Sequence, residues 1–153
     1  MKRFKLVIPV LLLTVVLAAC SNQKTGLPPP AQLFTEIQHS VSLPEMSEVS
    51  AYMLEENTGI SPEDYQQAVY YILTEGMSPD QIIIIQAKDE ASAVTVEKKL
   101  KSWLDYQINS SQIYLTEYMP LLQAGVIRRD GLMVSLIVSP ETERITQVYE
   151  TYE

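Results

Sequence analysis

The chain has 153 residues, with 19 acidic and 11 basic side chains and a formal net charge of −8. This acidic balance argues against nucleic acid as a partner, because nucleic-acid binding depends on cations that neutralise phosphates. It also argues against a folded part that lies on an anionic membrane surface, which attracts basic segments. The length suits a single domain that buries its core without metals or cross-links.

The first twenty residues have the layout of an export signal. Three basic side chains lie within the first five positions, an apolar run extends over residues 6–16, and Leu17-Ala18-Ala19-Cys20 closes it. The run is shorter than the roughly twenty apolar residues that a membrane-spanning helix needs. We therefore favour a signal peptide over residues 1–19. A transmembrane anchor with an incidental cysteine is the alternative.

The closing residues Leu17-Ala18-Ala19-Cys20 resemble the lipobox of bacterial lipoproteins. The resemblance implies that a diacylglyceryl group is attached to Cys20, that the leader is cut before it, and that acyl groups such as palmitate anchor the protein. Cys20 is the only cysteine, so lipidation accounts for a thiol that no second cysteine can pair. We expect a lipoprotein held at the extracytoplasmic face of the cell membrane. Loss of the basic leader would leave the mature chain at about −11.

Residues 20–30 are predicted to form a lipidated, proline-rich tether, because Pro28-Pro29-Pro30 favours an extended polyproline conformation. A proline-rich ligand for a partner domain is the alternative. A single domain then covers residues 31–153. It opens with three short elements, which we expect to be a helix over residues 31–40, an extended or irregular piece over 43–49 and a helix over 51–57.

The first predicted hairpin surrounds a turn at residues 76–80. The strand 81–87 contains Ile82-Ile83-Ile84-Ile85, which is branched at every Cβ and too short for a helix of its own. A continuous apolar run indicates burial on both faces, so this strand should be central and pair with residues 69–73. Ser61-Pro62-Glu63-Asp64, which precedes the hairpin, carries a helix-start signature.

The longest predicted helix follows the cap Asp89 and spans residues 90–109. Its core-facing stripe consists of Val96, Leu100, Trp103 and Leu104. A second helical piece, residues 112–124, should be kinked or split by Pro120, which has no backbone N–H to donate.

A second hairpin should join residues 125–129 to 132–139, because Asp130-Gly131 favours a tight turn. Ser139-Pro140-Glu141 then opens a final helix with an apolar stripe at Ile145, Val148, Tyr149 and Tyr152. We predict an α+β fold with an antiparallel-rich sheet of about four strands in two hairpins and helices mainly on one face. The expected order is ββ-αα-ββ-α after a helical lead-in.

Several segments resemble an uncharacterised family. They are Gly59-Ile60-Ser61-Pro62-Glu63-Asp64, Tyr70-Tyr71, residues 82–89, Tyr118-Met119-Pro120 and Gly131-Leu132-Met133-Val134. On these segments the chain resembles the domain-of-unknown-function family numbered 4358, small lipoproteins of mainly Gram-positive bacteria, over roughly residues 47–149. It departs at Thr58-Gly59, where members commonly have Tyr-Gly, and at Gln81-Ile82, where they have Glu-Ile. The resemblance implies a location and a fold and transfers no mechanism.

The sequence carries no recognisable motif for catalysis or metal binding. His39 has no cysteine or second histidine with which to complete a zinc site, and we expect it to be exposed near a helix end. Nucleophile-elbow, phosphate-loop, dinucleotide-binding and Ser-x-x-Lys patterns are missing. We therefore predict no catalytic residue, no metal site and no cofactor.

One cluster of acids leaves an enzymatic alternative open. Paired carboxylates cleave glycosidic bonds when one of them has a raised pKa, and a similar cluster can bind calcium weakly, although no Asp-x-Asp-x-Asp-Gly loop is present. Acids beside turns are usually solvated, so both alternatives rank low. The cluster consists of Glu45, Glu48, Glu55, Glu56, Glu63 and Asp64.

Nine tyrosines suggest an interaction surface, because tyrosine suits positions where a ring is buried and its hydroxyl stays wet. Tyr114 and Tyr118 lie one turn apart on the predicted helical piece and form our candidate interaction face for an envelope protein or glycan. Tyr70 and Tyr71 should point to opposite faces of their strand. A tyrosine-rich rim of the core is the alternative.

The function we expect from the sequence is a non-enzymatic interaction or accessory module of the cell envelope. A carboxylate-based enzyme acting on envelope material and a small-molecule binding lipoprotein are the alternatives. Expected partners are the membrane, through the lipid on Cys20, and an envelope protein or glycan.

Overall fold

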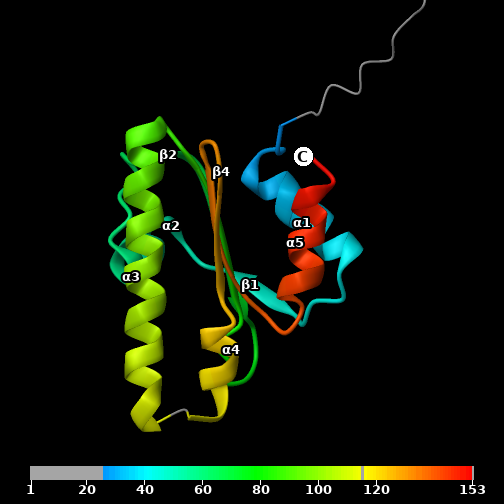
Figure 1. Ribbon diagram of the computed structural model, residues 1–153, viewed down its shortest axis with the longest axis vertical. Coiled ribbons are helices and arrows are strands. Elements are labelled where there is room, and N and C mark those ends of the chain that lie inside the picture. The colour runs from blue at the N-terminus through cyan, green and yellow to red at the C-terminus, as the bar shows by residue number, and fades with distance from the viewer. Residues whose placement is uncertain (1–25, 115, 153) are drawn as a thin grey trace, which may run out of the picture.

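A computed structural model describes residues 26–114 and 116–152. Its α+β architecture, which confirms the predicted class, is a sheet with helices on both faces (Figure 1). In chain order the elements are α1 (Pro30–Ser40), β1 (Met46–Glu48), α2 (Ala51–Thr58), β2 (Tyr65–Leu73), β3 (Gln81–Ala87), α3 (Glu90–Tyr114), the 3₁₀ helix η1 (Thr116–Tyr118), α4 (Met119–Gln123), β4 (Val126–Asp130), β5 (Met133–Val138) and α5 (Thr142–Glu150). Residues 1–25, including Cys20, lie outside the described part.

The sheet has five strands in the order β1-β2-β3-β5-β4, and every neighbouring pair is antiparallel. Both predicted hairpins, β2–β3 and β4–β5, are present, and β3 joins them by pairing with β5. The strand count of four was too low, because β1 adds an edge strand with Met46 opposite Leu73. A strand of three residues is too short for alternation to be recognised in a sequence.

Strands β3 and β5 form the buried centre of the sheet. Ile82 and Ile84 point to one face, Ile83 and Ile85 to the other, and all four side chains are 0% exposed. This confirms the prediction of burial on both faces. We call the two sides the α3 face and the α1 face, after the helices that cover them.

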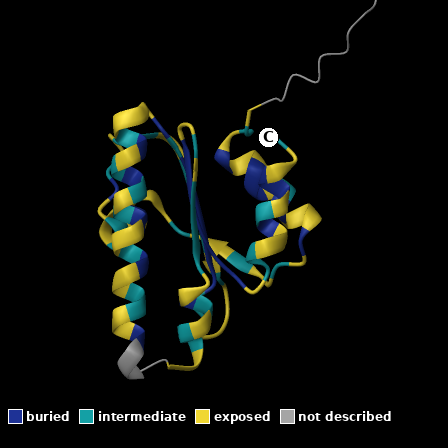
Figure 2. Cartoon of the chain, in the orientation of Figure 1, coloured by how far each residue is buried: buried dark blue, intermediate teal, exposed yellow. Residues whose placement is uncertain are grey.

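The α3 face is covered by α2, α3 and α4 (Figure 1). Figure 2 shows the buried stripe that runs along the sheet side of α3, with exposed residues on its outer side. Val96 and Leu100 are fully buried, Leu104 is nearly so, and Trp103 packs against their edge, as the predicted stripe required.

The α1 face is covered by α1 and α5 (Figure 1). Leu33 and Ile37 of α1 and Ile145 and Tyr149 of α5 are fully buried against it. The prediction that helices lie mainly on one face was therefore wrong. An all-apolar central strand needs cover on both sides, which the terminal helices supply.

The helical segment after β3 is divided at a different place than predicted, because the first helix continues beyond residue 109 and the second begins only at Met119. Helix α3 begins behind the Asp89 carboxylate, which accepts the backbone N–H of Ser92 at 2.7 Å, and continues to Tyr114. Pro120 does not interrupt a helix but lies in the first turn of α4. A proline lacks the N–H of a helix interior and clashes with the carbonyl four residues earlier, whereas a first turn tolerates it.

The Ser61-Pro62-Glu63-Asp64 segment does not begin a helix. The Asp64 N–H donates to the Ser61 carbonyl at 2.8 Å, and the Asp64 carboxylate accepts the Ser61 N–H at 3.2 Å, which closes a turn. β2 starts at the next residue, Tyr65. The β-prone sequence that follows outweighs the local cap signal.

Candidate functional site

Two hollows of the α3 face lie beside helix α2. The Ser50 hydroxyl caps its start by accepting the Met53 N–H at 3.3 Å, and Gly59, with φ at 70°, ends it in a left-handed conformation. Leu54 is the only residue of α2 that is buried. A short helix held by one apolar side chain leaves space on both flanks.

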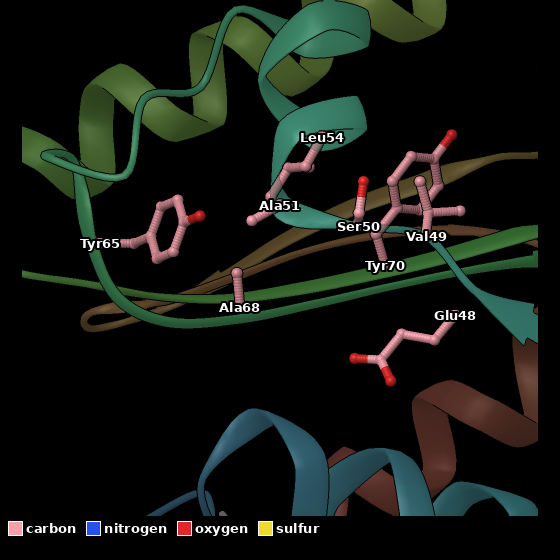
Figure 3. Close-up of a pocket in the computed structure, with 8 residues that line it drawn as sticks. All are labelled: Glu48, Val49, Ser50, Ala51, Leu54, Tyr65, Ala68 and Tyr70. Atoms are coloured by element: carbon pink, nitrogen blue, oxygen red, sulfur yellow. The ribbon is translucent and has the colours of Figure 1, made fainter.

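The first hollow, the β2 pocket, lies between the start of α2 and strand β2 and has a volume of about 340 Å³. Figure 3 shows the rings of Tyr65 and Tyr70 at its two ends, with Ala68 as the floor and Leu54 above. The small Ala68 side chain leaves the space between the two rings open. The pocket is therefore a slot bounded by two tyrosine rings.

Glu48 contributes only to the rim of this β2 pocket. Its carboxylate extends to the other side of the sheet in Figure 3, toward Tyr71, whose pKa is raised by burial and further by Glu48. Burial raises the pKa of Tyr65, and the nearby Glu55 raises it further; burial likewise raises the pKa of Tyr70. Both phenols thus stay protonated at neutral pH.

The second hollow, the α2–α3 pocket, lies between the end of α2 and the middle of α3 and has a volume of about 410 Å³. Its lining combines an aromatic pair with polar side chains. The lining residues are Glu56, Asn57, Thr58, Ser102, Trp103 and Tyr106.

The aromatic pair of the α2–α3 pocket consists of Trp103 and Tyr106. Their ring centroids lie 5.7 Å apart and their planes differ by 21°, so the rings are nearly parallel. Trp103 is half-buried, whereas Tyr106 is 62% exposed. The pair places an aromatic surface in contact with solvent at the mouth of the pocket.

A buried glutamine holds the indole in place. The Trp103 Nε1–H donates to Gln81 Oε1 at 3.0 Å, and Gln81 Nε2 donates to Gln107 Oε1 at 2.6 Å. Gln81 is 1% exposed and also accepts the Tyr70 hydroxyl at 3.4 Å. This Gln81 network connects the sheet to α3 and fixes the orientation of Trp103.

The sequence-based site residues are not assembled as expected. Tyr118 is half-buried in η1, and α3 ends at Tyr114, so the two residues do not share one continuous helix. The Tyr114 side chain and Cys20 lie outside the described part of the chain. The premise that Tyr114 and Tyr118 lie one turn apart on a helix was wrong, because α3 ends at Tyr114 and Tyr118 belongs to the separate 3₁₀ helix η1.

The other tyrosine prediction is confirmed. Tyr70 belongs to the core of the α3 face, and Tyr71 packs on the α1 face, where its ring stacks on Phe34 with centroids 3.6 Å apart. Tyr52 lies 68% exposed on the outer side of α2. His39 is exposed in the last turn of α1, as expected.

Two members of the acid cluster, Asp64 and Glu48, lie in different surroundings. Asp64 is joined to Lys99 Nζ at 2.7 Å, and this hydrogen bond lowers its pKa. Glu48 turns to the α1 face, away from the acids of α2. Across residues 26–114 and 116–152, no group of three or more His, Cys, Asp or Glu side chains is arranged to hold a metal ion.

Sequence reasoning did not select the α2–α3 pocket. Trp103 was assigned to the core stripe, and Tyr106, three residues later on the same helix, was given no role. One signal was available: Gln81 is a polar residue at the head of an otherwise apolar central strand, and a buried amide requires hydrogen-bond partners.

None of the helices in the described ranges combines the length and apolar character required to cross a membrane. Neither a curated protein nor a solved structure matches the chain. The sequence profile of one family, described as Domain of unknown function (DUF4358), matches residues 39–139. These residues contain all five strands and the α2–α3 pocket, and they stop short of α5, which the expected range of 47–149 included. The chain belongs to this family, the domain of unknown function DUF4358.

Proposed function

We propose that the protein is a lipid-anchored, extracytoplasmic binding module of the cell envelope that performs no covalent chemistry of its own. The observation that carries this proposal is the Trp103–Tyr106 pair, whose indole is fixed by buried Gln81 and whose tyrosine is exposed. Rigid aromatic side chains that contact solvent provide binding energy at a small cost in conformational entropy. Such an arrangement suits recognition.

The state of the carboxylates supports a non-enzymatic role. A general acid in glycoside cleavage needs a raised pKa. The three carboxyl groups with displaced pKa values in the described chain, Asp64, Asp89 and Glu97, are all lowered by hydrogen bonds. They are therefore ionised at neutral pH and cannot donate the proton that the reaction needs.

An anchor at Cys20 would be compatible with binding at the α2–α3 pocket. The first described residues, 26–29, lead into α1, across the sheet from the α2–α3 pocket (Figure 1). A lipid ahead of them would hold the protein from the α1 side. The pocket would then remain open to the envelope.

Anchoring is tested by labelling cells with an alkyne analogue of palmitate. The wild-type chain should incorporate the label and fractionate with membranes, whereas Cys20→Ala should do neither, because the chain has no other cysteine. Incorporation of the label by Cys20→Ala would contradict lipidation at this residue.

Binding is tested by crosslinking on intact cells followed by mass spectrometry. The anchored wild type should capture a specific envelope component, and Cys20→Ala and Tyr106→Ala should both lose it. Capture that is indifferent to Tyr106→Ala would remove the Trp103–Tyr106 pair from the binding surface. Release of a cleaved envelope product by the purified wild type would contradict the non-enzymatic role.

A further inference from the structure

We infer that the α2–α3 pocket binds a neutral pyranose ring of an envelope glycan. The inference rests on the proposed function as a binding module and names its ligand class. It follows from three properties of the pocket: the shape of its aromatic surface, the polar groups at its rim, and its charge.

The aromatic surface matches the face of a sugar ring. Trp103 and Tyr106 are stacked on one another with planes that differ by 21°, so the outer face of the stack is a flat platform rather than the walls of a cage. A pyranose presents C–H groups on its flat faces, and these weakly positive hydrogens are attracted to the negative face of an aromatic ring. The exposed Tyr106 ring is accessible to such a ligand.

The hydrogen-bonding group of the indole is used inside the protein rather than for a ligand. Its only donor, Nε1–H, is engaged with Gln81 Oε1 at 3.0 Å inside the protein. Gln81 is itself held by Gln107 at 2.6 Å, so the Trp103 ring does not need to reorganise when a ligand arrives. A preformed platform loses less entropy on binding than a mobile one.

The rim of the pocket supplies polar groups of the kind that sugar hydroxyls use. Glu56 and Asn57 lie at the end of α2, and Ser102 lies opposite on α3. A carboxylate accepts hydrogen bonds, whereas an amide and a hydroxyl both donate and accept. The volume of about 410 Å³ falls in the lower part of the range for small-molecule pockets, which suits one or two sugar rings.

The charge of the lining favours a neutral sugar. Among the described residues that line the pocket, Glu56 is the one charged side chain, and none is a lysine or an arginine. An anionic glycan or phosphate would therefore meet a carboxylate without a compensating cation. A quaternary ammonium group would be held best by rings at steep angles around it, which the nearly parallel pair does not provide.

The chain provides its own reporter for this binding, because Trp103 is the only tryptophan. The full-length protein is purified in a polyoxyethylene detergent, which carries neither sugar nor quaternary ammonium. Its tryptophan emission is followed during titration with cellotetraose and with tetra-N-acetylchitotetraose, and in parallel with tetragalacturonate and with choline. We expect a saturable change with a neutral tetrasaccharide and none with the other two probes.

Variants assign the response to the platform. Tyr106→Ala should weaken the affinity for the saccharide at least roughly tenfold, as expected for loss of an aromatic contact at the centre of a site. Tyr106→Phe should retain it, because the ring remains. Tyr52→Ala is the matched control, since Tyr52 is equally exposed but lies outside the pocket. Urea unfolding of each variant checks that the fold is intact.

Three outcomes overturn the inference: no saturable change with either neutral saccharide, a response to choline or tetragalacturonate alone, or equal loss in Tyr106→Ala and Tyr52→Ala. These outcomes are separable from failure of the proposed function. If an envelope protein is captured on cells but the saccharides cause no change in emission, the proposed binding function is supported and the glycan inference is wrong.

Discussion

Among single residues, Gln81 has the largest effect on how the α3 face is organised. Its amide binds Tyr70, Trp103 and Gln107 at the point where a strand, a hairpin partner and the long helix meet. Gln81 and Tyr70 are buried, and Trp103 and Gln107 are partly buried, so loss of the amide would leave several groups without hydrogen bonds. A buried network of this kind specifies one arrangement of α3 on the sheet.

The α1 face contains a smaller buried polar pair, which gives a residue-scale prediction. The Tyr149 hydroxyl donates to Ser135 Oγ at 2.8 Å, and the two residues are 0% and 1% exposed. Tyr149→Phe should lower the free energy of unfolding by about 1–3 kcal/mol, because the Ser135 hydroxyl is left buried without its partner. Urea denaturation measures the change.

The control for this prediction is a double-mutant cycle. Ser135→Ala should cost a similar amount, and the double variant Tyr149→Phe/Ser135→Ala should cost clearly less than the sum of the single changes. Strict additivity would show that the hydroxyl pair does not couple α5 to β5.

For individual elements, the sequence was most informative where the pattern was long or continuous. Strand 81–87 and both hairpins were predicted, and the stripe of α3 faces the core as expected. Two local signals misled: the cap-like Ser61 and the interior position of Pro120. At Ser61 the turn closed by Asp64 and the β-prone residues after it outweigh the cap signal, and Pro120 is accommodated in the first turn of α4 instead of inside a helix.

At the turn before β2, Lys99 donates a hydrogen bond to the Asp64 carboxylate, and this pair makes stability depend on pH. The Lys99 hydrogen bond holds the pKa of Asp64 below its usual value. The pair therefore contributes its full stability above the pKa of the unfolded chain, near 3.9, and loses it as the pH falls through the lower folded pKa. The side chains are 22% and 32% exposed, so the contribution should be below about 1 kcal/mol.

Comparison of the wild type with Asp64→Asn checks this expectation. The difference in free energy of unfolding should be present at pH 6 and shrink as the pH falls below the pKa of the unfolded chain. Asp105→Asn, at an exposed position on α3, is the control. A difference for Asp64→Asn that stays constant across this range would contradict the assignment to the Lys99 pair.

For the whole molecule, the chain's ends complete its core. The apolar side chains of Ile82 and Ile84 required cover on the α1 face, yet the sequence did not show that α1 and α5 would both be placed there. Helical periodicity identifies an apolar stripe but not the face of the sheet against which it packs. Similarly, the α2–α3 pocket depends on tertiary contacts between elements that are distant in the chain. The sequence therefore indicated only Gln81, the polar residue that holds Trp103.

The segment 39–139, which the family profile matches, should not fold by itself. It contains the five strands and the cover of the α3 face but lacks α5 and nearly all of α1. Without these helices, Val69, Ile82 and Ile137 would be exposed to water. We expect this fragment to lack a cooperative urea transition and to bind the dye ANS, whereas the full-length chain should unfold cooperatively.

A chain that ends at Glu150 is the matched control for this truncation. It keeps α5 and should unfold as the full-length protein does, with a modest loss from the Tyr152 contact to Glu36. A cooperative, dye-free fragment 39–139 would show that the helices of the α1 face are dispensable for folding.

The central β3–β5 pairing also sets the order in which the protein can assemble. The hairpins β2–β3 and β4–β5 join strands that are neighbours in the chain, and each can form by closing a short loop. The pairing of Gln81 with Val138 instead closes a loop that contains all of α3, η1 and α4. The entropy cost of that closure is offset only when both faces of the sheet are packed. The β3–β5 pairing between the two hairpins therefore forms late. The rate of folding is then set by the association of the two hairpins. During synthesis, β3 stays without its second neighbour until β5 has been made.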